Sequence, residues 1–411
     1  MTERVVVTGI GAFTPLGKDV QENWRRLLNA ECGFSVSEFE KCDTKVIGKV
    51  DYDIDLSSLL QEKEVRRLDR FSQLSLVAAA ETIMDSGITQ GDYERIGIYG
   101  SSGIGGLETI VKNHNTFLQR KRRGVSPFFI PMSLINMPPC IISRIFGFRG
   151  PSLSVVNACA SSAHAIGAAY HRILRGGVDA ILTGGTESAI SELGIAGFEV
   201  SGTLTKSENT NAASLPFDKR REGFVISEGA AFLMLEDLKH AKSRGAKIYA
   251  EIVGYGSSLD AYSNVAPDPD GRGAILAINM ALEDAKISWS QLSSINAHAT
   301  GTKIGDYSEL SAMCKIADKN SAKKKGICAN KSSIGHTLGT AGAIEAIFSI
   351  LSLKEDVLPP VANCNDPEEI LQNNFVFTVK KAKSFQQEYI LSNSLGFGGT
   401  NAVLVFKKYC H

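Results

Sequence analysis

One cysteine stands where a strand-forming run gives way to helix-forming residues. Residues 153–156 are mostly apolar, and small helix formers follow from Cys159 onward, so the sequence predicts a strand, a turn and a helix that begins at the cysteine. The first N–H groups of a helix lack internal partners and the macrodipole is positive there, which favours a thiolate and lowers the thiol pKa below about 8.5. Cys159 is therefore a candidate nucleophile. The alternative is a small buried residue that packs the helix on a sheet.

Two histidines in the C-terminal part could assist such a nucleophile. His298 lies in residues 295–302 at the predicted end of a strand, where chemistry is usual in α/β folds. His336 lies at a predicted helix start, where the dipole disfavours the imidazolium, and a neutral imidazole can donate one N–H to an oxyanion. A structural role is the alternative for each histidine. A zinc site of Cys159, His298 and His336 is a further alternative, although these residues lack the short spacing typical of zinc ligands.

The elements around these residues predict a parallel sheet covered by helices. After the helix at Cys159, residues 179–183 form another buried strand, and a strand–helix–strand unit with short turns pairs its strands in parallel. The C-terminal half repeats this order, because residues 328–345 again predict a strand end and a small-residue helix with a reactive side chain near its first turn. The glycine break in residues 390–401 matches the glycine break that follows Thr183 in the first half. We therefore expect a duplicated α/β chain that brings Cys159 and His336 together.

The composition excludes several classes of protein. Lys and Arg total 44 and Asp and Glu total 44 in 411 residues, so no global field would attract nucleic acid or an anionic membrane. The eight cysteines have no paired spacing, which argues against a disulfide framework and a structural zinc site and favours the reducing cytoplasm. Residues 4–9 predict a strand rather than a signal peptide, and no run approaches about 18 apolar residues, so we expect no membrane insertion.

Two glycine-rich turns follow predicted strands without completing a nucleotide-binding motif. In residues 9–17 Thr14 replaces the third glycine of a dinucleotide fingerprint, Pro15 follows, and no acidic residue ends a second strand at the expected distance. Residues 101–106 lack the Gly-Lys-Ser/Thr ending of a P-loop, so we predict that this turn packs its backbone closely beside a site. A nicotinamide-dependent oxidoreductase is therefore the last of the alternatives.

Two basic clusters are candidate docking surfaces. Arg66, Arg67 and Arg70 lie near the start of a helix predicted over residues 66–85, where cations gain nothing from the helix dipole. The tract 120–123 is the densest positive run in the chain. Such clusters could receive an acidic protein or a phosphate-bearing substrate arm, and a solvated surface is the alternative for both.

Four motifs follow one another over nearly the whole chain, namely residues 158–163 with Gly150 and Pro151 before them, residues 296–302 with Gly305 and Asp306, residues 331–336 with residues 341–343, and residues 393–401. Together they resemble the β-ketoacyl-[acyl carrier protein] synthases, in particular the type II enzymes of bacterial and plastid fatty-acid synthesis. The resemblance implies an α/β, thiolase-like fold, which is a duplicated five-layer αβαβα arrangement with mixed, mostly parallel sheets. It also implies a cytoplasmic homodimer that needs no cofactor.

The resemblance divides the chain into two halves and implies a reaction in two stages. The half with the cysteine is residues 1–250, and the half with both histidines and a glycine-rich gate is residues 251–411. Cys159 takes a fatty acyl chain from acyl carrier protein as a thioester. Malonyl-[acyl carrier protein] then loses CO2 and attacks this thioester, which lengthens the chain by two carbons.

The resemblance also implies a role for each matching residue. His298 and His336 stabilise the enolate, Lys331 has an electrostatic and positioning role, and the N–H groups of Cys159 and Phe397 form an oxyanion hole in which Phe397 is also a gate. The substrate-binding residues are Thr300 and Thr302 for the pantetheine arm and Ile104 and Phe198 for the acyl chain. Arg66, Arg67, Arg120, Lys121, Arg122 and Arg123 form the landing surface for the acidic carrier protein. No metal is required, and whether a structural monovalent ion lies near Asn296 and Glu345 stays open.

Three positions depart from the family pattern. Ala299 stands where a glycine is common, Leu395 where a phenylalanine is common, and Val265 where a pantetheine-facing threonine is frequent. These departures put chain-length preference and carrier contacts in question more than the reaction itself. A type I synthase or a polyketide condensing subunit is the alternative within acyl chemistry. A non-catalytic acyl-binding partner is the alternative outside it, and such a protein would be expected to lack the nucleophile.

Overall fold

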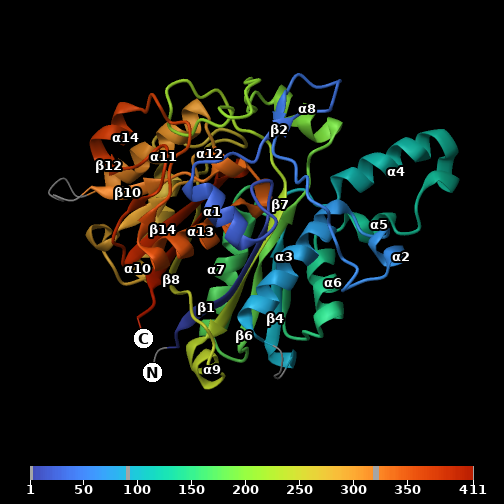
Figure 1. Ribbon diagram of the computed structural model, residues 1–411, viewed down its shortest axis with the longest axis horizontal. Coiled ribbons are helices and arrows are strands. Elements are labelled where there is room, and N and C mark those ends of the chain that lie inside the picture. Colours follow the sequence, from blue (N-terminus) through green and yellow to red (C-terminus); the bar gives the residue numbers. More distant parts are fainter. Residues whose placement is uncertain (1–2, 89–92, 318–323, 411) are drawn as a thin grey trace.

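The computed structural model describes residues 3–88, 93–317 and 324–410, and most of its strands form one large sheet (Figure 1). The eleven strands of this sheet are ordered β12-β10-β9-β14-β15-β8-β1-β7-β6-β4-β5. Their bounds are β1 Val5–Phe13, β4 Ile96–Ser101, β5 Ser152–Val155, β6 Ala180–Glu187, β7 Gly229–Asp237, β8 Ala250–Leu259, β9 Ser294–Asn296, β10 Lys325–Cys328, β12 Phe375–Val376, β14 Tyr389–Gly396 and β15 Thr400–Lys408. Two small pairs are β2 Ser35–Val36 with β3 Val46–Ile47, and β11 Val357–Leu358 with β13 Lys383–Ser384.

The large sheet contains the same five-strand unit twice. If the strands of each unit are numbered in chain order, β1, β4, β5, β6 and β7 lie in the order 3-2-4-5-1 from the outer edge inward. β8, β9, β10, β14 and β15 lie in the same order, with the short β12 added outside β10. In both units strand 2 pairs in parallel with strands 3 and 4, whereas strand 5 pairs antiparallel with strands 4 and 1. The predicted duplication and the mixed sheet are confirmed. Parallel pairing is confined to the outer strands of each unit, however, and does not predominate.

Helices separate the two units and cover their outer faces. α7 (Ser161–Leu174) and α13 (Ala341–Glu355) contact each other and strands of both units, so they form the central layer. α3 (Arg70–Ser86) packs on β1 and β7, and α10 (Arg272–Asp284) packs on β8 and β15. A Cβ at Gly342 on α13 would lie 2.8 Å from the Ala163 side chain on α7, so the close approach of the central helices requires glycine there. The predicted five-layer αβαβα fold is confirmed.

The remaining helices are α1 Val20–Leu28, α2 Glu62–Val65, α4 Leu107–Arg120, α5 Phe129–Ser133, α6 Met137–Phe146, α8 Glu192–Val200, α9 Leu238–Ser243, α11 Lys303–Ile316, α12 Lys331–Ile334 and α14 Glu369–Asn374. The Asp69 side chain caps α3 by accepting the Phe71 N–H at 3.1 Å. The helix predicted over residues 66–85 is therefore wrong at its beginning, because Arg66 and Arg67 lie between α2 and α3. Within the described ranges, no helix has the length and apolar character needed to cross a membrane.

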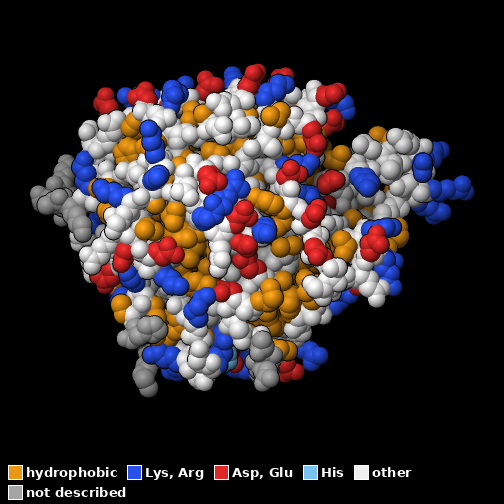
Figure 2. All heavy atoms as spheres, in the orientation of Figure 1, with side chains coloured by type: hydrophobic (Ala, Val, Ile, Leu, Met, Phe, Trp, Pro, Cys, Tyr) orange, Lys and Arg blue, Asp and Glu red, His pale blue; other side chains and the backbone are white. Residues whose placement is uncertain are grey.

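α4 and the residues after it form an arm that projects from the rest of the molecule (Figure 1). In Figure 2, Lys and Arg side chains gather at the end of this arm. Residues 120–123, at the end of α4 and in the short turn η2 (Lys121–Gly124), are all exposed. The densest positive tract of the sequence is thus presented to solvent, away from the sheet.

Candidate active site

Cys159 lies in a tight turn between β5 and α7. Ala158 before it has φ +48°, in the left-handed region that residues with a side chain rarely adopt. The Asn157 N–H donates to Ser161 Oγ at 2.8 Å, and Ser161 Oγ donates to the Ala158 carbonyl oxygen at 2.6 Å. Thr400 Oγ1 donates to the Asn157 carbonyl oxygen at 3.1 Å. Cys159 therefore precedes the helix by two residues instead of beginning it, and the turn sets its direction.

Burial raises the pKa of the Cys159 thiol to about 11, because the charged thiolate loses its solvation. The positive charge of Lys331 and the Phe397 N–H oppose this effect, and the negative charge of Glu187 adds to it. The predicted lowering of the thiol pKa is therefore wrong. Burial thus favours the protonated thiol at neutral pH, and a thiol must lose its proton as the sulfur reacts.

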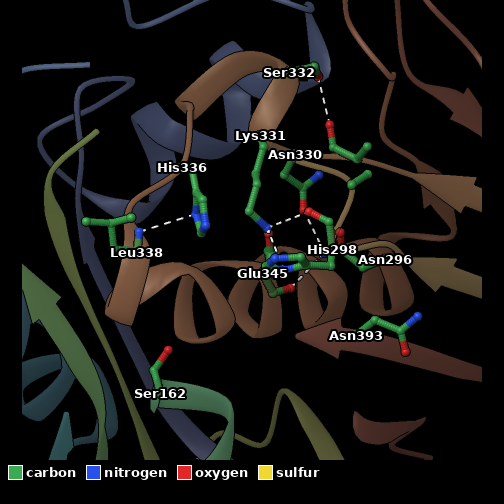
Figure 3. Close-up of polar contacts among 12 residues, drawn as sticks. Ser162, Asn296, His298, Asn330, Lys331, Ser332, His336, Leu338, Glu345 and Asn393 are labelled. Atoms are coloured by element: carbon green, nitrogen blue, oxygen red, sulfur yellow. Dashed lines mark hydrogen bonds and ion pairs between the residues drawn. The ribbon is translucent and has the colours of Figure 1, made fainter. Parts of the chain in front are cut away.

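His298 follows β9 and is held from two sides. The main-chain N–H of His298 donates to Glu309 Oε1, and the main-chain N–H of Ala299 donates to Glu309 Oε2, both at 2.8 Å. Lys331 Nζ lies 2.7 Å from the His298 carbonyl oxygen and 3.2 Å from His298 Nδ1, and it also pairs with the buried Glu345 carboxylate (Figure 3). Because an ammonium group only donates, Nδ1 is the acceptor and the ring proton lies on Nε2.

His336 lies between α12 and the short turn η4 (Leu338–Thr340), not at the helix start that the sequence predicts, since α13 begins at Ala341. Its Nδ1 accepts the Leu338 N–H at 3.3 Å (Figure 3), which again leaves the ring proton on Nε2. Burial, and secondly the charge of Lys331, lowers the pKa of both His298 and His336 well below its ordinary value. Burial, rather than a helix dipole, therefore favours the neutral form that the sequence predicts for His336.

These side chains meet at one cavity of about 560 Å³. Cys159, His298 and His336 line it, and the two imidazole rings lie 5.4 Å apart and nearly perpendicular to each other. The aromatic side chains that line it are Phe198, Phe224 and Phe397. The rings of Phe224 and His336 pack edge to face, with their centroids 4.9 Å apart. The cavity thus presents a thiol and two neutral imidazoles to one substrate.

The other predicted substrate residues are only partly brought together. Thr300 and Thr302 line the cavity with their hydroxyl oxygens 3.1 Å apart, and Phe198 lines its aromatic side. Ile104 does not line the cavity and is 36% exposed. Lys331 is buried behind His298, and the basic docking candidates Arg66, Arg67, Arg120, Lys121, Arg122 and Arg123 lie away from the cavity on the surface.

Two family models match the chain. They are described as "Beta-ketoacyl synthase, N-terminal domain", over residues 2–241, and "Beta-ketoacyl synthase, C-terminal domain", over residues 249–365. The chain belongs to the beta-ketoacyl synthase family. It is an enzyme of the condensing acyltransferase type, and its neighbours share the predicted thiolase-like fold.

Named relatives and solved structures align with nearly the whole length of this synthase. The chain is 40% identical over 411 residues to 3-oxoacyl-[acyl-carrier-protein] synthase 2 of Vibrio harveyi, with 98% of both chains covered. It is 40% identical over 414 residues to the enzyme of the same name from Staphylococcus aureus (strain COL), with 99% of both covered. The structure of a beta-ketoacyl synthase from Burkholderia phymatum STM815 superposes with a TM-score of 0.91 at 29% identity, covering 99% of this chain and 100% of that one. A type II polyketide ketosynthase structure, AntDE with its acyl-carrier protein AntF, has a TM-score of 0.90 at 28% identity, with both chains covered completely.

Sequence reasoning missed two groups that hold the histidines of this synthase. Glu309 lies on α11, three residues after Asp306, and both carboxylates accept N–H groups of the loop at His298. Two carboxylates three residues apart lie on one face of a helix, and this spacing in the sequence could have indicated that both face the same loop. Leu338 acts through its main-chain N–H at φ +50°, for which its residue type gives no signal.

The three departures from the family pattern all lie on the cavity of this synthase. Ala299 has φ +26°, so the chain keeps a conformation that favours glycine without having glycine there. Leu395 lies near Phe397, and Val265 is half exposed at the rim. In the described ranges, no three His, Cys, Asp or Glu side chains are placed to hold a metal ion, which leaves the zinc alternative without a ligand set.

Proposed function

We propose that this synthase is a 3-oxoacyl-[acyl-carrier-protein] synthase that elongates fatty acyl chains by two carbons in type II fatty-acid biosynthesis. The observation that carries the proposal is that two neutral imidazoles, His298 and His336, share one cavity with the Cys159 thiol. The 40% identity to relatives named 3-oxoacyl-[acyl-carrier-protein] synthase 2 supports the choice of substrates. In this proposal residues 1–250 supply the nucleophile, and residues 251–411 supply the two imidazoles and the gate.

In the first stage the sulfur of Cys159 attacks the carbonyl carbon of the acyl thioester on the carrier. The C–S bond to the carrier's pantetheine breaks, and the departing thiolate takes the proton that leaves Cys159. The N–H groups of Cys159 and Phe397 lie against the thiol sulfur, where they can stabilise the oxyanion of the tetrahedral intermediate. A Cβ at Gly398 would meet no atom within 4 Å, which leaves room for the proposed gate to move.

In the second stage the malonyl group loses CO2 and becomes an enolate. The Nε2–H groups of His298 and His336 donate to its thioester oxygen, and because both rings are neutral they stabilise this oxyanion without competing to protonate the carbon. The enolate carbon attacks the carbonyl of the acyl-Cys159 thioester. The C–S bond to Cys159 breaks, the 3-oxoacyl chain leaves on the second carrier, and the thiolate takes a proton from water.

Lys331 is a positioning residue in this scheme. Its ammonium donates to Nδ1 of His298 and so keeps the proton of that ring on Nε2. The Glu345 carboxylate neutralises the buried cation, as a buried charge requires. Asn296 Oδ1 and Glu345 Oε2 are buried without hydrogen-bond partners, and oxygens of this type suit a structural monovalent cation. If such an ion is bound, thermal unfolding will occur at a lower temperature in choline chloride than in sodium or potassium chloride.

The hydroxyls of Thr300 and Thr302 are proposed to bind the amides of the pantetheine arm, because they lie together on the cavity wall. Phe198 is proposed to pack against the acyl chain. Its ring centroid lies 6.4 Å from that of Phe397, so movement of the gate would change the width of the acyl site. Ile104 is proposed to contact the acyl chain as well, although it does not line the cavity in this structure.

The basic residues are proposed to receive the acidic carrier protein, by analogy with AntDE, a ketosynthase whose solved structure is a complex with its acyl-carrier protein. Arg67 lies 4.4 Å over the ring of Phe128, and Arg66 pairs with Glu62. The tract 120–123 extends this positive surface to the end of the α4 arm. Salt should weaken carrier binding if these contacts form, because exposed charge pairs are screened.

A homodimer in the cytoplasm, with no nucleic-acid partner, completes the proposal. β5 is an edge strand of the large sheet. Its apolar residue Leu153 is 42% exposed, and Val156, directly after the strand, is 51% exposed. An exposed apolar edge strand is a template for pairing, and a second copy of β5 can cover it with twofold symmetry. Sedimentation equilibrium of the full chain should give twice the monomer mass.

The experiment that tests the function is to incubate the protein with a long-chain acyl carrier protein, digest it, and weigh the peptide that contains residue 159. We expect the mass of that peptide to rise by the mass of the acyl group, and CO2 to be released when malonyl-[acyl carrier protein] is added. An unmodified Cys159 together with no release of CO2 would refute the proposal. The polyketide alternative predicts repeated condensation of one chain without reduction, whereas a fatty-acid enzyme stops after one.

A further inference from the structure

Glu187 is a buried carboxylate beside the site that the mechanism above does not use. It ends β6, and its partners are N–H and O–H groups rather than a cation. Its Oε1 accepts the Ser102 hydroxyl at 2.7 Å and the Ile104 N–H at 3.2 Å. Its Oε2 accepts the Gly103 N–H at 2.6 Å and the Gly339 N–H at 3.0 Å. Burial raises the pKa of Glu187, and these four hydrogen-bond donors, three of them main-chain groups that can only donate, oppose that effect by favouring the ionised carboxylate.

Two glycines pack directly on this carboxylate. A Cβ at Gly103 or at Gly339 would lie 2.8 Å from Glu187 Oε2, closer than real Cβ contacts. This contact confirms that the glycine-rich turn of residues 101–106 packs its backbone closely beside a site. Glu187 therefore joins two segments that are far apart in the chain, namely this turn from the first unit and η4 from the second.

One of these segments controls His336. Leu338 donates its N–H to His336 Nδ1 while its own φ is +50°, a conformation that a leucine does not hold without support. The next N–H, of Gly339, is the one that Glu187 accepts. The hydrogen bond to Glu187 thus holds the peptide that follows Leu338, which is adjacent to the peptide whose N–H keeps the proton of His336 on Nε2.

The other segment lies beside the nucleophile. A Cβ at Gly103 would be 3.6 Å from the carbonyl oxygen of Ala158, the residue before Cys159. The next residue is Ile104, which the proposed function assigns to the acyl site. The charge of Glu187 also acts on the thiol, because it raises the pKa of Cys159.

We propose that Glu187 is a positioning residue that holds the acyl-side turn and the His336 segment in one arrangement, so that both half-reactions depend on the same carboxylate. This inference rests on the proposed function for its division into two half-reactions. It assigns no contact between Glu187 and the substrate.

The test is the variant Glu187→Gln in the full chain, because the amide has nearly the same shape. The amide of glutamine has one accepting oxygen and one NH2 group. In either orientation its NH2 group therefore faces two of the four donors that the Glu187 carboxylate accepts. We expect the rate of malonyl decarboxylation to fall by about 10-fold to 100-fold at an almost unchanged KM, less than the roughly 10²–10³-fold cost of deleting an oxyanion donor. We also expect iodoacetamide to alkylate Cys159 with a midpoint at lower pH, because the charge that raises the thiol pKa is gone.

Three further variants separate positioning from general structure. Thr183→Val on the same strand removes a buried hydroxyl that has no hydrogen-bond partner and should leave both measurements unchanged. Glu187→Asp keeps the charge but shortens the reach, so decarboxylation should fall while the alkylation midpoint stays in place. If Glu187→Gln does not fold, Ser102→Ala removes one donor alone and should lower decarboxylation several-fold without moving the midpoint.

Equal effects of Glu187→Gln and Thr183→Val, or no effect of Glu187→Gln on either measurement, would overturn the inference. The alkylation measurement needs no acyl or malonyl substrate. A failure of the proposed function would therefore show in the wild-type protein as absent decarboxylation, whereas a failure of the inference would show in Glu187→Gln as unchanged decarboxylation together with an unmoved alkylation midpoint.

Discussion

The two units of the sheet have the same topology but place different chemistry at equivalent strand ends. The third strand of the first unit, β5, leads to Cys159, and the third strand of the second unit, β10, leads to Lys331 and His336. The fourth strand of the first unit, β6, ends in the buried carboxylate of Glu187, whereas the fourth strand of the second, β14, ends at a glycine before Phe397. The shared backbone therefore determines where groups meet, and each unit supplies its own reactive side chains.

Burial acts in opposite directions on the groups from the two units. It raises the pKa of the Cys159 thiol and lowers the pKa of the two imidazoles, because in each case the charged form is penalised. Lys331 lowers the pKa of all three groups. One buried cation therefore favours the thiolate in the first unit and the neutral imidazoles in the second.

The largest expected effect comes from the nucleophile of the first unit. Cys159→Ala should reduce acyl transfer by on the order of 10⁴-fold or more, because no other group forms the covalent intermediate. Decarboxylation of malonyl-[acyl carrier protein] should persist, since it uses groups of the second unit. Peptide mass and CO2 release measure the two halves separately, and an acylated peptide from the variant would contradict the assignment.

The next largest effect should come from the histidines of the second unit. His298→Ala should lower decarboxylation by about 10²–10³-fold, the usual cost of losing one oxyanion donor. Acyl transfer to Cys159 should fall by much less, because its oxyanion contacts are N–H groups of Cys159 and Phe397. Single-turnover rates of both steps decide this point. Intact decarboxylation in the variant would rule out the enolate-stabilising role.

Lys331→Met should change the titration of the Cys159 thiol in the first unit and of the two imidazoles in the second unit. Loss of the positive charge should move the thiol pKa further above about 11 and let the pKa values of both imidazoles rise toward their ordinary range. Iodoacetamide should therefore react more slowly with Cys159 at every pH below that value. Lys315→Met, at an exposed ion pair on α11, is the control and should leave the profile unchanged. A shift to lower pH in Lys331→Met would contradict the sign.

The smallest expected effect concerns the backbone at Ala299. Ala299→Gly removes the penalty of a positive φ, and the greater freedom of glycine in the unfolded chain offsets part of this gain, so the free energy of unfolding should rise by up to about 1 kcal/mol. Urea unfolding of the two proteins measures the difference. Clear destabilisation would mean that the alanine methyl group contributes more through packing than its backbone conformation costs.

The sequence predicts the duplication and the residues that meet at the cavity, because each depends on local pattern and on the order of motifs, but it overestimates how much of the sheet is parallel. It misplaces Cys159 and His336 relative to their helices, since the turn at Cys159 depends on a contact from the distant Thr400 and the turn at His336 depends on the positive φ of Leu338. The predicted direction of the thiol pKa is wrong because a local dipole argument omits burial, which only the assembled fold determines.

The hydrogen bond from the Leu338 N–H to His336 makes the tautomer of that imidazole a property of the main chain. Alanine scanning at position 338 leaves this donor in place, and among the genetically encoded residues only proline removes it directly. The position can therefore exchange side chains during evolution while the donor persists. Replacing that single amide with an ester by chemical ligation is the direct way to expose its contribution, because this substitution deletes the N–H and leaves every side chain intact.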